Sequence, residues 1–180
     1  FFVVLNQDGD YLVGTLGKNL VKVKRDGSAV TTILTGQPQV TIPLRERGSG
    51  DWILYNNSGQ LLRYTHDWSS VLATISHGSS PVYEMIQDAQ RPDVYLAARD
   101  LARYDPRTNA VSILASIHPG ILGDRGIVTD RAPGAGGAMI YLSSPAINNP
   151  TTLSSGLRLD RSGAVLGTVA TLPAPVTSLP

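Results

Sequence analysis

The chain has 180 residues, a usual length for one domain, and its 15 basic and 14 acidic side chains leave a net charge of +1, which argues against nucleic-acid binding. With 42% hydrophobic and 16% charged residues the chain is too apolar to be disordered, yet no apolar run is long enough to predict a membrane span. The absence of cysteine excludes a disulfide scaffold, a thiolate zinc site and a cysteine nucleophile within this sequence.

Three markers repeat along the chain with one period. A basic residue between two apolar neighbours recurs at spacings of 41, 40 and 55 residues, at Lys22, Arg63, Arg103 and Arg158. A small residue followed by valine recurs at Ala29-Val30, Ser70-Val71, Ala110-Val111 and Ala164-Val165. An aspartate precedes an apolar segment at Asp10, Asp51 and Asp93, where the fourth copy has Ala138. Because three markers agree, the sequence indicates an internal repeat.

The predicted elements follow this repeat in chain order. The copies occupy residues 1–38, 39–80, 81–124 and 125–173, and residues 174–180 resemble the start of a further copy. Each copy is expected to hold four short strands joined by turns rich in Gly, Asn, Asp and Ser. The second copy shows them most clearly, with expected strands at Val40–Leu44, Trp52–Tyr55, Leu61–Tyr64 and Val71–Ile75. In the third copy, the segment from Pro81 to Gln87 aligns with a first strand, although it can also be read as a short helix.

The fourth copy has an insertion between its second strand and its basic marker. The extra residues fall within the polar, uncharged stretch from Ser143 to Gly156. We expect this stretch to lie outside the sheet as an ordered loop, because long loops on a rigid scaffold usually carry function. Asn148 and Asn149 are its candidate binding residues.

Four antiparallel strands repeated every 40 to 45 residues are typical of a β-propeller. A single four-stranded sheet leaves both faces open, whereas stacked sheets, or blades, bury each other. We therefore predict an all-β chain with four propeller blades, as one segment of a larger propeller. A complete four-bladed ring, or two copies that close an eight-bladed ring, remain the alternatives.

The blade pattern also resembles a group of known families. Asp-Gly or Ser-Gly turns and a Gly-x-Pro link carry the likeness, at Asp8-Gly9, Asp26-Gly27, Arg161-Ser162-Gly163 and Gly36-Gln37-Pro38. This pattern is similar to that of NHL-repeat, gluconolactonase-like and streptogramin-lyase-like propellers. The resemblance implies a ligand site around the central channel, on the face that carries the second-to-third and fourth-to-first strand connections.

Polar residues in these connections are the candidate site. The candidate binding residues are Lys18, Asn56, Asp100 and Arg125, together with the two asparagines of the insertion. His77 and His118 follow the fourth strand in consecutive copies, so with Asp124 they are the candidate catalytic residues. The alternative reading is that both histidines are solvated loop residues.

Gluconolactonase-like propellers hold a divalent cation through Glu, Asn and Asp side chains of inner strands, so the resemblance implies Glu84 and Asp130 as weak metal candidates. The alternative is that both are surface turn residues. The repeated basic residue is expected to cover the next blade with its aliphatic stem while its charge stays in water. Trp52 and Trp68 are expected to pack between blades rather than to form a sugar platform.

These observations favour a non-enzymatic binding or scaffold propeller without a cofactor, in the extracellular space or the periplasm. Its expected partners are a protein or small-molecule ligand, and either further blades of a parent chain or a second copy that closes the ring. The alternative function is a metal-dependent hydrolase or lyase on the same scaffold, with calcium or magnesium as its cofactor.

Overall fold

The structure is a computed structural model that describes residues 2–5, 8–15, 18–36, 43–56, 58–76, 82, 84–88, 90–98, 100–115, 125–129, 139–143 and 154–172. Within these ranges the chain forms strands and turns and has no helix. No helix among the described residues is therefore long and apolar enough to cross a membrane.

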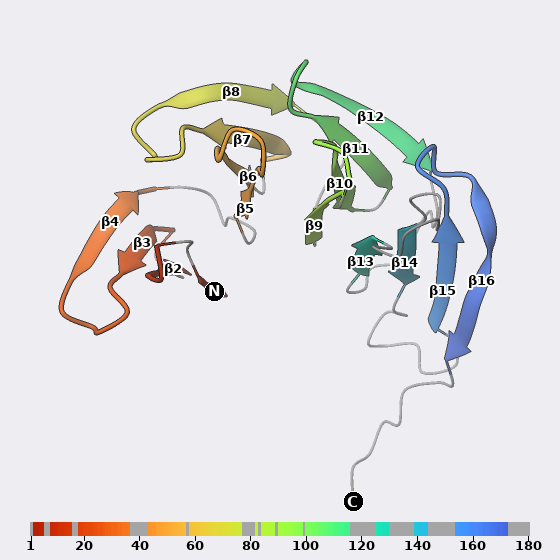
Figure 1. Ribbon diagram of the computed structural model, residues 1–180, viewed down its shortest axis with the longest axis horizontal. Helices are drawn as coiled ribbons and strands as arrows, with labels where there is room; N and C mark the ends of the chain where they lie inside the picture. The colour runs from red at the N-terminus through yellow and green to blue at the C-terminus, as the bar shows by residue number, and fades with distance from the viewer. Residues whose placement is uncertain are drawn as a thin grey trace, which may run out of the picture. The chain divides into compact units, whose positions relative to one another are not determined.

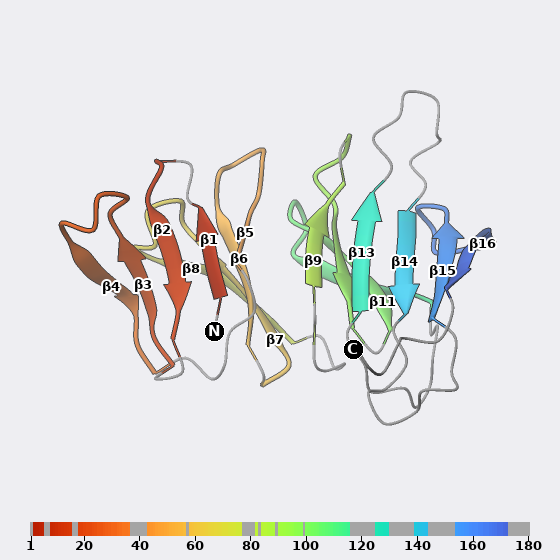
Figure 2. The same ribbon diagram turned by 90° about the horizontal axis from the view of Figure 1, so that it is seen from below.

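The strands form four antiparallel sheets of four strands each, and the strands of every sheet are paired in sequence order (Figures 1 and 2). We call these sheets blades 1 to 4. Blade 1 contains β1 (Phe2–Leu5), β2 (Tyr11–Gly14), β3 (Leu20–Val23) and β4 (Val30–Leu34). Blade 2 contains β5 (Leu44–Arg45), β6 (Trp52–Asn56), β7 (Gln60–Tyr64) and β8 (Val71–Ser76).

The second half of the chain repeats this arrangement. Blade 3 contains β9 (Glu84–Gln87), β10 (Val94–Ala97), β11 (Leu101–Asp105) and β12 (Ala110–Ala115). Blade 4 contains β13 (Arg125–Thr129), β14 (Met139–Ser143), β15 (Ser154–Leu159) and β16 (Val165–Leu172). Within the segment from Pro81 to Gln87, residues Glu84–Gln87 are thus a strand, as the alignment with the other copies predicts, and not a helix.

One prediction about the insertion is wrong at its edges. The stretch from Ser143 to Gly156 was expected to lie wholly outside the sheet, but β14 includes Ser143 and β15 begins at Ser154. Gly156 pairs with Leu142 and Ala170, so the third strand of blade 4 is longer than its apolar residues alone suggest. Residues 144–153, with Asn148 and Asn149, lie outside the described residues.

The turn between the third and fourth strands shows why these sequences form hairpins. In each blade an aspartate carboxylate accepts a hydrogen bond from the backbone N–H two residues later, and the accepting residues are Asp26, Asp67, Asp105 and Asp160. Each of these turns also contains a residue with positive φ, and these residues are Gly27, Trp68, Asn109 and Gly163. Glycine adopts this conformation without strain, so two of the turns are encoded locally.

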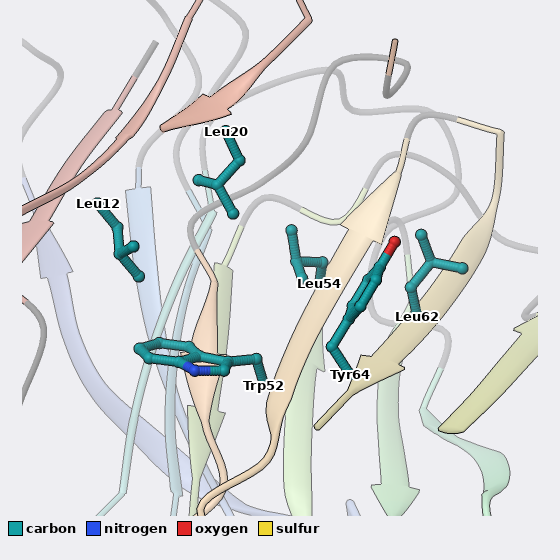
Figure 3. Packing of buried hydrophobic residues seen from close by; sticks show 6 residues of the cluster. All are labelled: Leu12, Leu20, Trp52, Leu54, Leu62 and Tyr64. Atoms are coloured by element: carbon teal, nitrogen blue, oxygen red, sulfur yellow. The ribbon is translucent and has the colours of Figure 1, made fainter. Parts of the chain in front are cut away.

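The chain divides into two compact units, residues 1–80 and residues 81–180, of two blades each. In the first unit, Leu12 and Leu20 of blade 1 pack against Trp52 and Leu54 of blade 2 (Figure 3). In the second unit, Leu159 of blade 4 packs against a cluster in blade 3 that consists of Tyr95, Ala97 and Leu101. Each unit therefore has its own core at the junction of two blades.

The tryptophans belong to the first of these cores. Trp52 is 3% exposed, and its indole N–H donates a hydrogen bond to the carbonyl oxygen of His66 at 3.1 Å. Trp68 stacks on Trp52 with ring centroids 4.9 Å apart and an interplanar angle of 19°. Both rings lie in the core at the junction of blades 1 and 2, as the sequence predicts, and Trp68 has a φ of 68° that a bulky residue rarely adopts.

Candidate functional site

Each blade has two ends, which the hairpin topology keeps apart. One end carries the turn between the second and third strands and the link to the next blade, and we call it the 2–3 end. The other end carries the turns between the first and second strands and between the third and fourth strands, and we call it the 1–2 end. The predicted binding residues should lie at the 2–3 ends.

The turn at the 2–3 end of blade 1 presents Lys18. Lys18 has a φ of 63° and is exposed, and its N–H donates a hydrogen bond to the carbonyl oxygen of Thr15 at 3.1 Å. The Thr15 hydroxyl accepts a hydrogen bond from the Asn19 N–H at 3.3 Å. These hydrogen bonds join the described residues of the turn, and Lys18 is exposed there at the 2–3 end.

The equivalent turn of blade 2 is organised by Asn56, which is 4% exposed. Its Oδ1 accepts hydrogen bonds from the N–H groups of Ser58 and Gln60, both at 3.1 Å, and its Nδ2 donates to Oε1 of Gln60. Gly59 takes a φ of 79° in the same turn. The Asn56 side chain thus holds the turn together, and its role in ligand binding stays a prediction.

In blades 3 and 4 the candidate residues also lie at the 2–3 end. Asp100 is in the turn between β10 and β11, and its carbonyl oxygen accepts a hydrogen bond from the Ala98 N–H at 3.1 Å. Glu84, the first residue of β9, is exposed and pairs in register with Ala97, so two carboxylates share this end of blade 3. Arg125 begins β13 and pairs in register with Ser143, which places it at the 2–3 end of blade 4.

The other candidates fall outside the residues that the structure describes. They are the predicted catalytic residues His77, His118 and Asp124, the metal candidate Asp130, and the two asparagines of the insertion. Among the described residues, no three His, Cys, Asp or Glu side chains come together to hold a metal ion. The predicted catalytic and metal sites therefore stay predictions.

Sequence reasoning missed a repeated ion pair at the 1–2 end. Arg63 donates two hydrogen bonds to Oδ2 of Asp51, from Nη2 at 2.7 Å and from Nε at 3.0 Å, and its side chain is 16% exposed. Lys22 lies 3.5 Å from Oδ2 of Asp10 in the equivalent place. The expectation that this charge stays in water is therefore wrong for Arg63, because the repeated aspartate before the second strand neutralises it. The signal was the equal distance of 12 residues between the two markers in the first two copies.

A second ion pair joins blades 3 and 4. Arg161 contacts Asp88 with two nitrogens, Nε at 2.8 Å from Oδ2 and Nη2 at 3.0 Å from Oδ1, and the Asp88 side chain is only 2% exposed. The Gln90 N–H donates to the same carboxylate at 2.8 Å, and the Tyr95 hydroxyl lies 3.3 Å from it. Burial raises the pKa of Asp88, but Arg161 and these hydrogen bonds outweigh burial and hold the pKa below its usual range.

Every described group with a shifted pKa lies towards the 1–2 end. Burial raises the pKa of Tyr95 to about 12, and the charges of Asp88 and Asp93 add to this effect. Hydrogen bonds from the Thr65 hydroxyl and from Ser69 lower the pKa of Asp67. Perturbed pKa values often mark active sites, but here each shift follows from a turn or from a contact between neighbouring strands or blades.

One open pocket also lies at this end, in blade 1. It has a volume of about 290 Å³ and is lined by Asp10, Lys24, Arg25 and Asp26. Two of its four side chains have structural partners, since Asp10 pairs with Lys22 and Asp26 caps its own turn. The pocket is therefore a consequence of the turn structure.

Comparisons with family models and with curated protein sequences give no match. Solved structures do match. An auxiliary nutrient binding protein from Bacteroides thetaiotaomicron aligns with 93% of this chain at a TM-score of 0.61 and 14% identity, and one from Bacteroides ovatus aligns with 93% at 0.57 and 11%. BBS1N, solved in complex with ARL6DN, aligns with 97% at 0.53 and 16%.

This chain spans only part of those proteins, since the alignments cover 46% of each Bacteroides chain and 65% of BBS1N. At identities this low the likeness concerns the fold alone. It agrees with the four antiparallel sheets, the repeated turns and the cores between blades. The chain is therefore an all-β protein with the β-propeller type of fold, built here from four blades.

Proposed function

We propose that the chain is a non-enzymatic binding or scaffold propeller whose ligand site lies at the 2–3 ends of its blades. The observation that carries this proposal is the separation of roles between the two ends. At the 1–2 ends, the described carboxylates with shifted pKa values are held in turn caps and ion pairs, so they serve the fold. The 2–3 ends carry Lys18, Asp100 and Glu84, which are polar groups of a kind that suits recognition.

The chemistry of the 2–3 ends suggests a polar ligand. Lys18 offers a cation, Asp100 and Glu84 offer carboxylates, and Arg125 begins a strand at the same kind of end. Asn56 supports its turn from within the blade and so preorganises neighbouring groups. A site of this kind binds by hydrogen bonds and ion pairs to a small polar molecule or a polar protein surface. The proposal includes no cofactor.

The neighbours support binding as the general role. Two of them are described as nutrient binding proteins, and a third was solved as a complex with another protein. Capture of nutrients occurs outside the cytoplasm in bacteria, so we propose an extracellular or periplasmic location. We also propose that further blades close the ring, either from a longer parent chain or from a second copy.

The binding proposal is tested by substituting Lys18. Thermal unfolding is measured with a set of soluble probes, namely neutral oligosaccharides, amino acids and inorganic phosphate, and any probe that stabilises the chain is titrated by calorimetry. We expect Lys18→Ala to weaken binding of that probe roughly tenfold, as loss of a charged hydrogen bond does.

Lys24 provides a matched control, because it is also an exposed lysine in a turn of blade 1 but lies at the 1–2 end. Lys24→Ala should leave the affinity unchanged. Loss of affinity in the Lys24 variant and not in the Lys18 variant would show that the probe binds at the 1–2 end, which would contradict the proposal. Stabilisation by calcium or magnesium alone, with hydrolysis of a lactone or ester probe, would favour the enzyme instead.

A further inference from the structure

The turn at the 2–3 end of blade 1 holds a lysine in a backbone conformation that favours glycine. Lys18 has a φ of 63°, in the left-handed region where a Cβ crowds the following carbonyl oxygen. Glycine adopts this conformation without strain, whereas a long side chain adopts it at a cost in stability. Strained residues of this kind cluster at binding and active sites, where the side chain rather than the turn accounts for the residue.

The repeat shows that the turn itself does not need a lysine. The equivalent residue of blade 2 is Gly59, at a spacing of 41 residues, and it has a φ of 79°. Both turns are closed by the same hydrogen bond, since the N–H of Lys18 donates to the carbonyl oxygen of Thr15 and the N–H of Gly59 to that of Asn56, each at 3.1 Å. Nothing lies within 4 Å of a Cβ placed on Gly59. Glycine therefore makes this turn in blade 2, and packing requires no side chain there.

The charge of Lys18 is not neutralised by any residue that the structure describes. Lys18 is exposed, and none of the described residues forms an ion pair with it. The polar side chains of the same turn, Thr15 and Asn19, are neutral. The ammonium group of Lys18 can therefore bind a ligand without first breaking a contact within the protein.

The acidic residues of the first unit all lie at the other ends of its blades. They occupy the turns between first and second strands and between third and fourth strands, and they are Asp8, Asp10, Asp26, Glu46, Asp51 and Asp67. The sequences that connect strands at the 2–3 ends of this unit, residues 15–19, 35–43, 57–59 and 77–80, contain no Asp or Glu. Hairpin topology thus keeps Lys18 apart from the carboxylates of its unit, and this end of blade 1 attracts anions.

We propose that Lys18 binds an anionic group of the ligand, a carboxylate or a phosphate, at the 2–3 end of blade 1. The ammonium group donates charge-assisted hydrogen bonds to the anion. The lysine lowers the stability of the free protein and contributes affinity for an acidic ligand. This inference rests on the ligand site proposed above and adds the chemical class of its ligand.

The substitution Lys18→Gly tests the cost of the lysine to the fold, because glycine relieves the backbone and removes the cation. The melting temperature of Lys18→Gly should rise by about 2 °C relative to the parent chain. Lys24 is the matched control, since it is also an exposed lysine in a turn of blade 1 but does not have a positive φ. Lys24→Gly should therefore lower the melting temperature. A lower melting temperature of Lys18→Gly would show that the lysine serves the turn, and the inference would fail.

The ligand class is tested by calorimetry with two matched pairs of probes, namely galacturonic acid with galactose and glucose 6-phosphate with glucose. We expect the acid of one pair to bind, and its neutral counterpart to bind at least about tenfold more weakly. Binding of galacturonic acid identifies a carboxylate as the recognised group, and binding of glucose 6-phosphate identifies a phosphate. Lys18→Gly should reduce the affinity for that acid about tenfold, whereas Lys18→Arg and Lys24→Gly should retain it.

Three binding results would overturn the inference. Equal affinity for an acid and its neutral counterpart would show that the charge of the ligand is not recognised. Unchanged affinity of the acid for Lys18→Gly would show that another group holds the anion. Failure of both acids to bind at millimolar concentration would show that this end has no anion site.

A failure of the proposed ligand site itself gives a different result. A loss of affinity in Lys24→Gly and not in Lys18→Gly would place the site at the 1–2 end and overturn both proposals. A neutral sugar that binds the parent chain and all three variants equally would overturn only the assignment of an acidic ligand to Lys18.

Discussion

Two of the repeated aspartates form ion pairs with the repeated basic residues, although the sequence shows each of these residues only as a separate marker. Asp51 and Arg63 are 12 residues apart, and they meet because β6 and β7 form a hairpin in which Arg63 lies opposite Ile53. Asp51 lies two residues before Ile53, so its side chain is on the same side of the sheet and can reach Arg63. Asp10 and Lys22 form the equivalent pair in blade 1. The fourth copy has Ala138 at this position, and Arg158 there is exposed.

Arg161→Ala should destabilise the protein by about 2 kcal/mol, because it leaves the buried carboxylate of Asp88 without its guanidinium partner. The value is below that of a fully isolated buried charge, since Gln90 and Tyr95 still contact the carboxylate. Urea unfolding at neutral pH measures the change. Arg107 is 64% exposed, so Arg107→Ala is the control and should shift the midpoint little.

The pH dependence of the stability loss in Arg161→Ala tests whether this loss comes from the charge of Asp88. The folded state lowers the pKa of Asp88, so the stabilisation is present above the ordinary pKa of an aspartate, about 3.9, and is lost as the pH falls through the folded-state value. The difference between the parent chain and Arg161→Ala should therefore shrink below about pH 4. A difference that stays constant down to pH 2 would mean that the arginine acts through packing alone.

At the scale of elements, the turn between the third and fourth strands serves two purposes. In blade 1 it only reverses the chain, because nothing lies within 4 Å of a Cβ placed on Gly27. In blade 4 the same turn also packs against blade 3. A Cβ on Gly163 would lie 2.7 Å from Cβ of Leu114 and 3.0 Å from its backbone. Glycine is thus required at Gly163 by a neighbouring blade as well as by its φ.

Gly163→Ala and Gly27→Ala separate these two requirements. Both glycines have positive φ, 89° and 73°, so both substitutions should cost about 1 kcal/mol in backbone strain. Gly163→Ala should cost about 2 kcal/mol more, since the backbone of Leu114 must move. Urea unfolding of both variants gives the difference. Equal losses would show that blades 3 and 4 do not meet at this turn.

At the scale of the whole molecule, protection from solvent should follow strand position in every blade. The second strands β6 and β10 are buried along their whole length, whereas the outermost strand β8 is exposed at Val71 and Leu72. An edge strand also bonds to only one neighbour. The amide hydrogens of β6 and β10 should therefore exchange at least about tenfold more slowly than those of β8 and β12.

Hydrogen exchange followed by mass spectrometry resolves these segments. The comparison is made within one molecule, so differences between preparations do not enter, and rates are corrected for the intrinsic exchange of each peptide. Uniform rates across the strands of a blade would contradict the buried position of β6 and β10.

The sequence predicted the fold well because a blade is encoded locally. Its strands are short, its turns are rich in Asp, Asn, Ser and Gly, and four copies repeat the pattern, so β6, β7 and β8 lie within a residue of their expected bounds. The sequence predicted the candidate site less well. Asn56 was predicted to be a binding residue, but its hydrogen bonds within the turn depend on the orientation of its side chain, which the spacing of residues in the sequence does not reveal.

The sequence by itself determined the period, the four strands of each copy, and the end of the blade at which Lys18, Asp100 and Arg125 lie, because hairpin topology follows from local pattern. Only the tertiary structure decided which residues meet across blades. Arg161 and Asp88 are 73 residues apart, and Leu12 of blade 1 packs in one cluster with Trp52 of blade 2. Such contacts depend on how one sheet stacks on the next, and the sequence of a single repeat does not determine that stacking.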